Sequence, residues 1–234
     1  MYKRILLKLS GEQLAGEHEF GVDPKIAKYL AQEIKQVTST GVQIAIVVGG
    51  GNMVRGVEVA GNGIRRVTAD QMGMLSGLIN AMALTDIFES EGLATRCLTN
   101  VFVEQLAESY SYRLAEKHLQ NGRVLIIAGG MARPYFSHDT AAVSFGLELD
   151  CEVVIKASKV DGVYDRDPAI FPDANRLEYM SFADAVSNVD VMVMDKAALG
   201  LALEQEQKLV VFDAMQPGNL SRLIEGESVG TTIN

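Results

Sequence analysis

Short apolar runs alternate along the chain with longer segments in which apolar residues recur at helical spacing. Six of the short runs are rich in Ile, Val and Leu and have the length of buried strands: residues 4–9, 43–48, 94–98, 123–128, 152–157 and 208–212. Strands that alternate with helices are typical of a mostly parallel sheet with helices on both faces. The pattern therefore predicts an α/β fold built on a mostly parallel central sheet.

Helices are predicted from the same periodicity and from capping residues. The first begins at Pro24, after Asp23 as N-cap, and is closed by Gly41. Three more are expected over residues 68–90, 110–120 and 139–149. Asp139 is the predicted N-cap of the last of these. The Met- and Leu-rich segment 70–84 has the spacing of an ordinary buried helix, so we expect it in the core.

Composition is that of a globular protein, with 48% hydrophobic and 22% charged residues among 234. The apolar runs are too short to cross a bilayer and no secretion signal is evident, so we expect a cytoplasmic protein without a membrane partner. Cys97 and Cys151 fit no metal-binding spacing and are expected to be buried. His18 and His118 lie among charged residues and are expected at the surface.

The net charge of −9 disfavours nucleic acid as a partner but leaves an anionic small molecule open. Four predicted strands end in segments whose glycines and charged residues suit a phosphate: residues 8–12, 49–56, 129–142 and 156–168. Because the carboxyl ends of parallel strands share one edge, these segments should line one crevice. Residues 49–51 are all glycine, so their backbone N–H groups can meet an anion, and Arg55 adds a positive charge.

Lys8 lies inside an apolar strand, where a lysine is costly unless its ammonium reaches water or an anion. Plainer interpretations exist: Lys8 extends to solvent, and Asp139 only caps a helix. Asp161, Asp165 and Asp167 are equally explained as turn residues. Together, however, cations and carboxylates around glycine loops favour phosphoryl transfer, which depends on positioning and charge neutralisation. The P-loop and dinucleotide fingerprints are both absent.

Eight strings of residues carry a resemblance to a known family: "YKRILLKLSGE", "AQEIK", "GGGNMVRG", "ADQMGML", "GRVLIIAGG", "PYFSHDTAA", "KVDGVYDRDP" and "MDKAAL". Their order and their spread over essentially the whole chain make the match specific. On these strings the chain resembles the bacterial uridylate (UMP) kinases of the amino acid kinase family.

The resemblance implies one three-layer αβα domain over residues 1–234, in which roughly 1–140 bind the acceptor and 141–234 bind ATP. It implies a kinase that transfers the γ-phosphoryl group of ATP, with Mg²⁺, to UMP in pyrimidine nucleotide biosynthesis. It also implies a homohexamer that is activated by GTP and inhibited by UTP. No direct protein ligand for the metal is implied, because the ATP phosphates would hold it.

Individual roles follow from the same resemblance. Catalytic roles are implied for Lys8, Arg55, Asp139 and Lys156. ATP binding is implied for Lys8, Leu9, Ser10, Gly11, Gly51, Arg55, Ser158, Tyr164 and Asp167. UMP binding is implied for Gly50, Asp70, Met131, Ala132, Arg133, Pro134, Tyr135, Phe136, Ser137 and His138. The GTP effector would meet Gly16, Glu17, His18, Glu19, Phe20 and Gly21.

Two other functions stay open on the sequence. One is a phosphotransferase of the same fold with a different acceptor, such as a carboxylate or carbamate. The other is a non-catalytic protein that binds a nucleotide or oxyanion. The chain also departs from the family pattern T-G-N-P-[FY]-F-[TS]-T-D at residues 131–138. Arg133 there could face either the base or the phosphate of the acceptor. If it faces the phosphate, we expect His138, which replaces a threonine, to add positive charge when protonated near pH 6.5.

Overall fold

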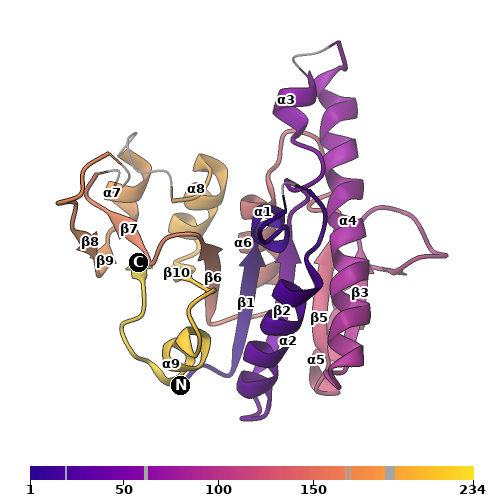
Figure 1. The fold of residues 1–234 in the computed structure, drawn as a ribbon, viewed down its shortest axis with the longest axis horizontal. Coiled ribbons are helices and arrows are strands. Elements are labelled where there is room, and N and C mark those ends of the chain that lie inside the picture. The colour runs from indigo at the N-terminus through magenta and orange to yellow at the C-terminus, as the bar shows by residue number, and fades with distance from the viewer. Residues whose placement is uncertain (19, 61–62, 167, 169, 188–192) are drawn as a thin grey trace.

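The computed structural model describes residues 1–18, 20–60, 63–166, 168, 170–187 and 193–234. At its centre is a nine-stranded sheet with the order β4-β3-β5-β2-β1-β6-β10-β11-β9 (Figure 1). Its six longer strands pair in parallel: β1 (Arg4–Leu9), β2 (Gln43–Val48), β3 (Thr95–Thr99), β5 (Val124–Ala128), β6 (Val153–Ser158) and β10 (Leu209–Asp213). These are the six predicted strands, each within one residue at either end, which confirms the mostly parallel sheet.

The remaining strands are short and were not predicted. They are β4 (Glu108–Ser109) beside β3, β11 (Thr231–Ile233) antiparallel to β10, β9 (Tyr179–Met180) beside β11, and a separate pair, β7 (Val163–Tyr164) and β8 (Arg176–Leu177). Two or three residues are too few to leave an alternating pattern in a sequence.

Helices cover both faces of the sheet. On one face lie α2 (Pro24–Thr38), α4 (Arg66–Ser90) and α9 (Asn219–Glu225). On the other lie α5 (Tyr112–Gln120), α6 (His138–Glu148), α7 (Phe182–Ser187) and α8 (Lys196–Glu204). Side chains of β1 alternate between the two layers: Ile5 and Leu7 pack toward the first and Leu6 toward the second. The predicted three-layer α/β architecture is therefore confirmed.

Two short helices and the start of α4 lie at the carboxyl edge of the sheet. The short helices are α1 (Gly11–Leu14), directly after β1, and α3 (Gly56–Ala60). α4 runs antiparallel to the strands, and its first turns project with α3 beyond the strand ends (Figure 1). This edge therefore gathers residues from the start of α4 and from the segments after β1 and β2.

Capping differs from the prediction at one of two helices. Asp23 caps α2 as predicted, because its carboxylate accepts a hydrogen bond from the Lys25 N–H at 2.8 Å. The prediction that Asp139 caps α6 was wrong. Ser137 is the N-cap, and its hydroxyl accepts from the N–H of Asp139 at 2.9 Å. Asp139 lies in the first turn instead, which leaves its carboxylate available for other partners.

The prediction that the Met-rich helix lies in the core holds for only part of its surface. Met74 and Leu78 are buried in α4, whereas Leu75, Ile79 and Met82 are exposed. The three exposed residues are four and three positions apart and so form one stripe along the helix. Among the described residues, no helix is long and apolar enough to cross a membrane.

Buried polar groups include one histidine predicted at the surface. His118 is only 4% exposed, and its ring nitrogens contact the Arg123 guanidinium at 2.9 Å and the Glu108 carboxylate at 3.4 Å. The surface prediction was wrong because these two partners satisfy the ring inside the fold. His18 is exposed as predicted. Cys151 is buried as predicted, and Cys97 is partly buried.

Candidate active site

Two lysines on neighbouring strands share one carboxylate at the carboxyl edge of the sheet. The parallel register pairs Lys8 of β1 with Lys156 of β6, so both side chains leave the same face. That face is covered by α6, whose first turn carries Asp139. Lys8 Nζ lies 2.9 Å from Asp139 Oδ1, and Lys156 Nζ lies 2.9 Å from Asp139 Oδ2. The structure thus brings together three of the four predicted catalytic residues.

Electrostatics keep this carboxylate charged. Burial alone would raise the pKa of Asp139, but the Lys8 and Lys156 ammonium groups hold it below its usual value. Burial lowers the pKa of Lys156, against the attraction of Asp139. Lys156 also donates to the Val193 carbonyl at 2.6 Å. The site therefore presents two oriented amines around one anion, an arrangement suited to stabilising added negative charge.

The glycine loop after β2 is packed closely against its neighbours. A Cβ on Gly11 would lie 2.7 Å from the Gly49 carbonyl oxygen and 2.9 Å from the Gly51 nitrogen. A Cβ on Gly50 would lie 2.5 Å from Cβ of Ser76 in α4. Part of the bare backbone therefore serves close packing inside the protein, and the rest faces two cavities.

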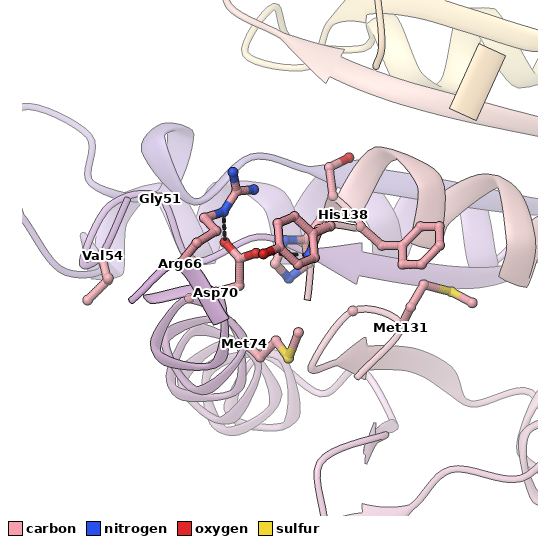
Figure 2. A pocket seen from close by; sticks show the side chains of 13 residues that line it. Gly51, Val54, Arg66, Asp70, Met74, Met131 and His138 are labelled. Carbon is pink, nitrogen blue, oxygen red and sulfur yellow. Dashed lines mark hydrogen bonds and ion pairs between the residues drawn. The ribbon is translucent and has the colours of Figure 1, made fainter. Parts of the chain in front are cut away.

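The first cavity has a volume of about 240 Å³ and lies between the glycine loop, α4 and the segment that follows β5 (Figure 2). Its lining includes most of the residues predicted to bind UMP: Gly50, Asp70, Met131, Tyr135, Phe136, Ser137 and His138. The lining does not include Ala132, Arg133 or Pro134. The Arg133 side chain is exposed at the surface instead.

Asp70 connects two walls of this cavity, α4 and the segment after β5, through its carboxylate. Its Oδ1 accepts from Nε of Arg66 at 2.7 Å, the contact drawn in Figure 2, and its Oδ2 accepts from the Tyr135 N–H at 2.9 Å. Tyr135 has a φ of 71°, a conformation that costs a non-glycine residue energy and that surrounding contacts must maintain. The Arg66 guanidinium also lies 5.3 Å from the centre of the Tyr135 ring. The sequence marks Arg66 only as one of the positive charges near a glycine, and its contacts with Asp70 and Tyr135 were not predicted.

His138 is neutral at physiological pH. Burial and the nearby Lys8 ammonium lower the pKa of its imidazole to about 4, although Asp139 opposes the shift. Its Nε2 has no hydrogen-bond partner within the described chain. The expectation that His138 adds charge near pH 6.5 was therefore wrong, because a cation beside Lys8 in a partly buried position is unfavourable.

A second cavity of about 450 Å³ lies between α1, the residues that follow it and the segment 51–55. Gly51 lines both cavities. Arg55 also lines the second one, where its guanidinium pairs with the Glu12 carboxylate at 2.5 Å. The other Glu12 oxygen lies 3.9 Å from Lys159 Nζ. Glu12 has no role in the sequence prediction, although it directly follows Gly11.

The remaining residues predicted to bind ATP lie around the ends of β1 and β6. Lys8 and Leu9 are buried at the end of β1, and Ser10 is the N-cap of α1. Gln13 of α1 donates to the Ser158 carbonyl at the end of β6, at 2.9 Å. The Tyr164 hydroxyl donates to Asp161 at 2.6 Å. Asp167 lies outside the described residues.

Residues predicted for the effector lie between α1 and α2. Gly16, His18 and Phe20 line the second cavity. Its lining does not include Glu17 or Gly21, and Glu19 lies outside the described residues. The predicted effector stretch therefore faces the same space as Arg55.

Asp195 connects the site to α8 and was also missed. Its carboxylate accepts from the Ser137 hydroxyl and, at 3.0 Å, from that of Thr140. It also caps α8 by accepting from the N–H of Ala197 at 2.9 Å. An aspartate directly before an apolar helical run signals a cap, but nothing in the sequence links it to α6.

Known proteins are similar to this chain in both sequence and structure. A family model described as "Amino acid kinase family" matches residues 3–213. The chain belongs to the amino acid kinase family. Among solved structures, the chain is similar to the UMP kinase from Bacillus anthracis, with 35% identity and a TM-score of 0.95 over 100% of this chain and 96% of that one.

Two further structures extend the comparison. The UMP kinase from Ureaplasma parvum shares 29% identity with this member of the family at a TM-score of 0.92, over 100% of this chain and 99% of that one. The uridylate kinase from Archaeoglobus fulgidus has 24% identity, a TM-score of 0.76 and full coverage of both chains, and shows a shared fold. All three comparisons cover the whole of this chain.

Proposed function

We propose that this protein is a UMP kinase that transfers the γ-phosphoryl group of ATP to UMP, giving UDP and ADP in pyrimidine nucleotide synthesis. The observation that carries the proposal is the Lys8–Asp139–Lys156 cluster, which lies beside a glycine loop that lines two cavities. The similarity to UMP kinases along the whole chain supports the same conclusion.

Phosphoryl transfer depends mainly on positioning the two substrates and on neutralising charge. A phosphate oxygen of UMP attacks the γ-phosphorus, the bond to the β–γ bridging oxygen breaks, and that oxygen leaves with ADP. Negative charge on the transferred group is spread over its oxygens, so fixed cations stabilise the transition state. Lys8 and Lys156 supply that charge, and Asp139 orients both ammonium groups. Arg55 and the N–H groups of the glycine loop contribute further positive potential.

The two substrates would approach from the two sides of the glycine loop. UMP occupies the 240 Å³ cavity between α4 and the segment after β5, within roughly residues 1–140. ATP lies along the ends of β1 and β6, with its adenosine toward residues 141–234 and Tyr164. Gly51, which lines both cavities, would then lie near the transferred phosphoryl group.

Mg²⁺ would bind together with ATP, held by the ATP phosphates. Both Asp139 oxygens face ammonium groups at 2.9 Å, which leaves this carboxylate a poor metal ligand and a good positioning group for lysines. Within the described ranges, no three His, Cys, Asp or Glu side chains cluster in a way that could hold a metal. When bound to the phosphates, the ion neutralises part of their charge.

Assembly and regulation are part of the proposal. The exposed stripe of Leu75, Ile79 and Met82 on α4 suits contacts between subunits of a cytoplasmic homohexamer. GTP would activate through residues 16–21. UTP would inhibit because it shares the uridine group recognised in the UMP cavity.

A panel of acceptors tests the function. With ATP and Mg²⁺, the protein should phosphorylate UMP faster than CMP, dUMP, GMP or N-acetylglutamate. Preference for N-acetylglutamate would indicate a different acceptor on the same fold. Nucleotide binding without turnover of any acceptor would indicate a binding protein and contradict the proposal.

Replacing Asp70 separates ribose recognition from loop positioning. We expect the parent to prefer UMP over dUMP, because a carboxylate oxygen can accept further hydrogen bonds from ribose hydroxyls. Asp70→Ala should reduce that preference, measured as the ratio of kcat/KM for the two acceptors. If Asp70 only holds the Tyr135 N–H and Arg66, the variant should weaken both acceptors equally and leave the ratio unchanged.

Lowering the pH should reduce the stability of the protein through His138 and leave the contribution of His138 to UMP affinity unchanged. Because the pKa of His138 is about 4 in the fold and near 6.5 when unfolded, the unfolded chain binds the extra proton between these values. The stability contributed by neutral His138 is therefore present above pH 6.5 and is lost as pH falls toward 4. The Tm of the parent should fall more steeply over this range than that of His138→Thr. The KM for UMP should have the same pH profile in both proteins from pH 8 to 6, and a parent KM that improves toward pH 6 would contradict a neutral His138.

A further inference from the structure

Two buried asparagines form a reciprocal pair behind the glycine loop. Asn52 lies in the turn that follows the loop and is 6% exposed, and Asn80 lies in α4 and is fully buried. Nδ2 of Asn52 donates to Oδ1 of Asn80 at 3.0 Å, and Nδ2 of Asn80 donates to Oδ1 of Asn52 at 2.7 Å. Amides suit this closed pair, because each side chain carries both a donor and an acceptor.

The outer hydrogen bonds of the pair reach two separate segments. Nδ2 of Asn80 also donates to the Gly49 carbonyl at 2.7 Å, and Nδ2 of Asn52 also donates to the Gly21 carbonyl at 2.6 Å. All four N–H groups of the two amides are therefore used. A buried polar network that is fully satisfied in this way rigidifies the groups it joins.

A third segment packs against the same pair. A Cβ on Gly11 would lie 2.4 Å from Oδ1 of Asn52, so the segment after β1 lies directly against the amide. The network thus joins α4, the glycine loop, the segment after β1 and the residues that lead into α2. The hydrogen bond from Asn80 to the Gly49 carbonyl fixes the peptide group that joins Gly49 to Gly50. Gly50 lines the 240 Å³ cavity proposed to bind UMP.

We propose that Asn52 and Asn80 are positioning residues that fix the glycine loop for phosphoryl transfer and couple it mechanically to residues 20–23. The first part rests on the proposed kinase function, and the coupling does not. A change in residues 20–23 moves Gly21 and, through the two amides, the Gly49 carbonyl. The reverse path also holds, because coupling between two segments is reciprocal.

Asn80→Ala tests the coupling, because Asn80 bonds Asn52 and the Gly49 carbonyl, and Asn52 in turn bonds the Gly21 carbonyl. Amide hydrogen exchange is measured by mass spectrometry on the full-length protein. We expect faster exchange both around residues 49–52 and in residues 20–23. Thr85→Ala is the matched control, because it removes a polar group from the same helix that contacts the Ala81 carbonyl and Cys97 and neither the glycine loop nor the asparagine pair. Acceleration limited to residues 49–52, or equal in both variants, would overturn the coupling.

Kinetics test the positioning role. Asn80→Ala should lower kcat by about 2- to 30-fold, the range measured for residues that act through others, while Thr85→Ala leaves it unchanged. Asn52→Ala and the double variant complete a cycle, in which the two losses should be less than additive because each breaks the same pair. Additive losses, or an unchanged kcat in a folded Asn80→Ala protein, would overturn the role. A parent without kinase activity would refute the proposed function, and the exchange result would still decide the coupling.

Discussion

Lys8→Ala is expected to lower kcat by about 10²- to 10³-fold while the protein stays folded. The lysine lies at the end of β1 with its Nζ held 2.9 Å from Asp139, so its charge is already oriented before substrate binds. Its loss costs little stability, because Asp139 keeps Lys156 at 2.9 Å and the repulsion between the two ammonium groups disappears. Steady-state kinetics with UMP and ATP, together with thermal unfolding, measure both effects.

Lys28→Ala is the control for removing a lysine. Lys28 pairs with Glu91 at 3.4 Å on the exposed surface of α2 and lines neither of the two cavities, and such pairs contribute little. Its kcat should equal that of the parent. Normal turnover in Lys8→Ala would remove this lysine from the mechanism and leave it only a structural role as a partner of Asp139.

Asp139→Asn should lower kcat by a similar factor and also cost stability. An amide keeps the shape of the side chain but leaves two partly buried ammonium groups without their shared anion. Loss of a charge-assisted hydrogen bond costs about 1.5 to 3 kcal/mol, so the unfolding free energy should fall by that order. Kinetics and denaturant unfolding on the same preparation measure both.

Ser111→Ala controls for the loss of stability alone. The Ser111 hydroxyl accepts from the Leu114 N–H and caps α5, and its removal should cost about 1 kcal/mol without changing kcat. If Asp139→Asn lost stability but kept its turnover, the carboxylate would have only a structural role. A loss of turnover well beyond that of Ser111→Ala supports its role in orienting Lys8 and Lys156.

The sheet could be predicted because strands buried on both faces are continuous apolar runs. Residues 43–48 are such a run and form β2 between β1 and β5. The outer face of α4 could not be predicted, because the helix is apolar on all sides and periodicity does not show which side is covered. Leu75 and Ile79 are therefore exposed against expectation.

Site residues were predictable where they break a local pattern. Lys8 stands out as a charge inside an apolar run, and residues 49–51 as consecutive glycines at a strand end. Asp195 and Asn80 break no local pattern. Their partners are 55 residues away in the case of Thr140 and 28 in the case of Asn52, so only the tertiary fold shows what they do.

Transfer of label from ATP to UMP tests the central claim most directly. The protein is incubated with Mg²⁺, UMP and ATP labelled at the γ-phosphate, and the nucleotides are separated. We expect the label to move into UDP, with one ADP formed for each UDP. Label found only in inorganic phosphate, or retained in ATP while UMP stays unchanged, would contradict it.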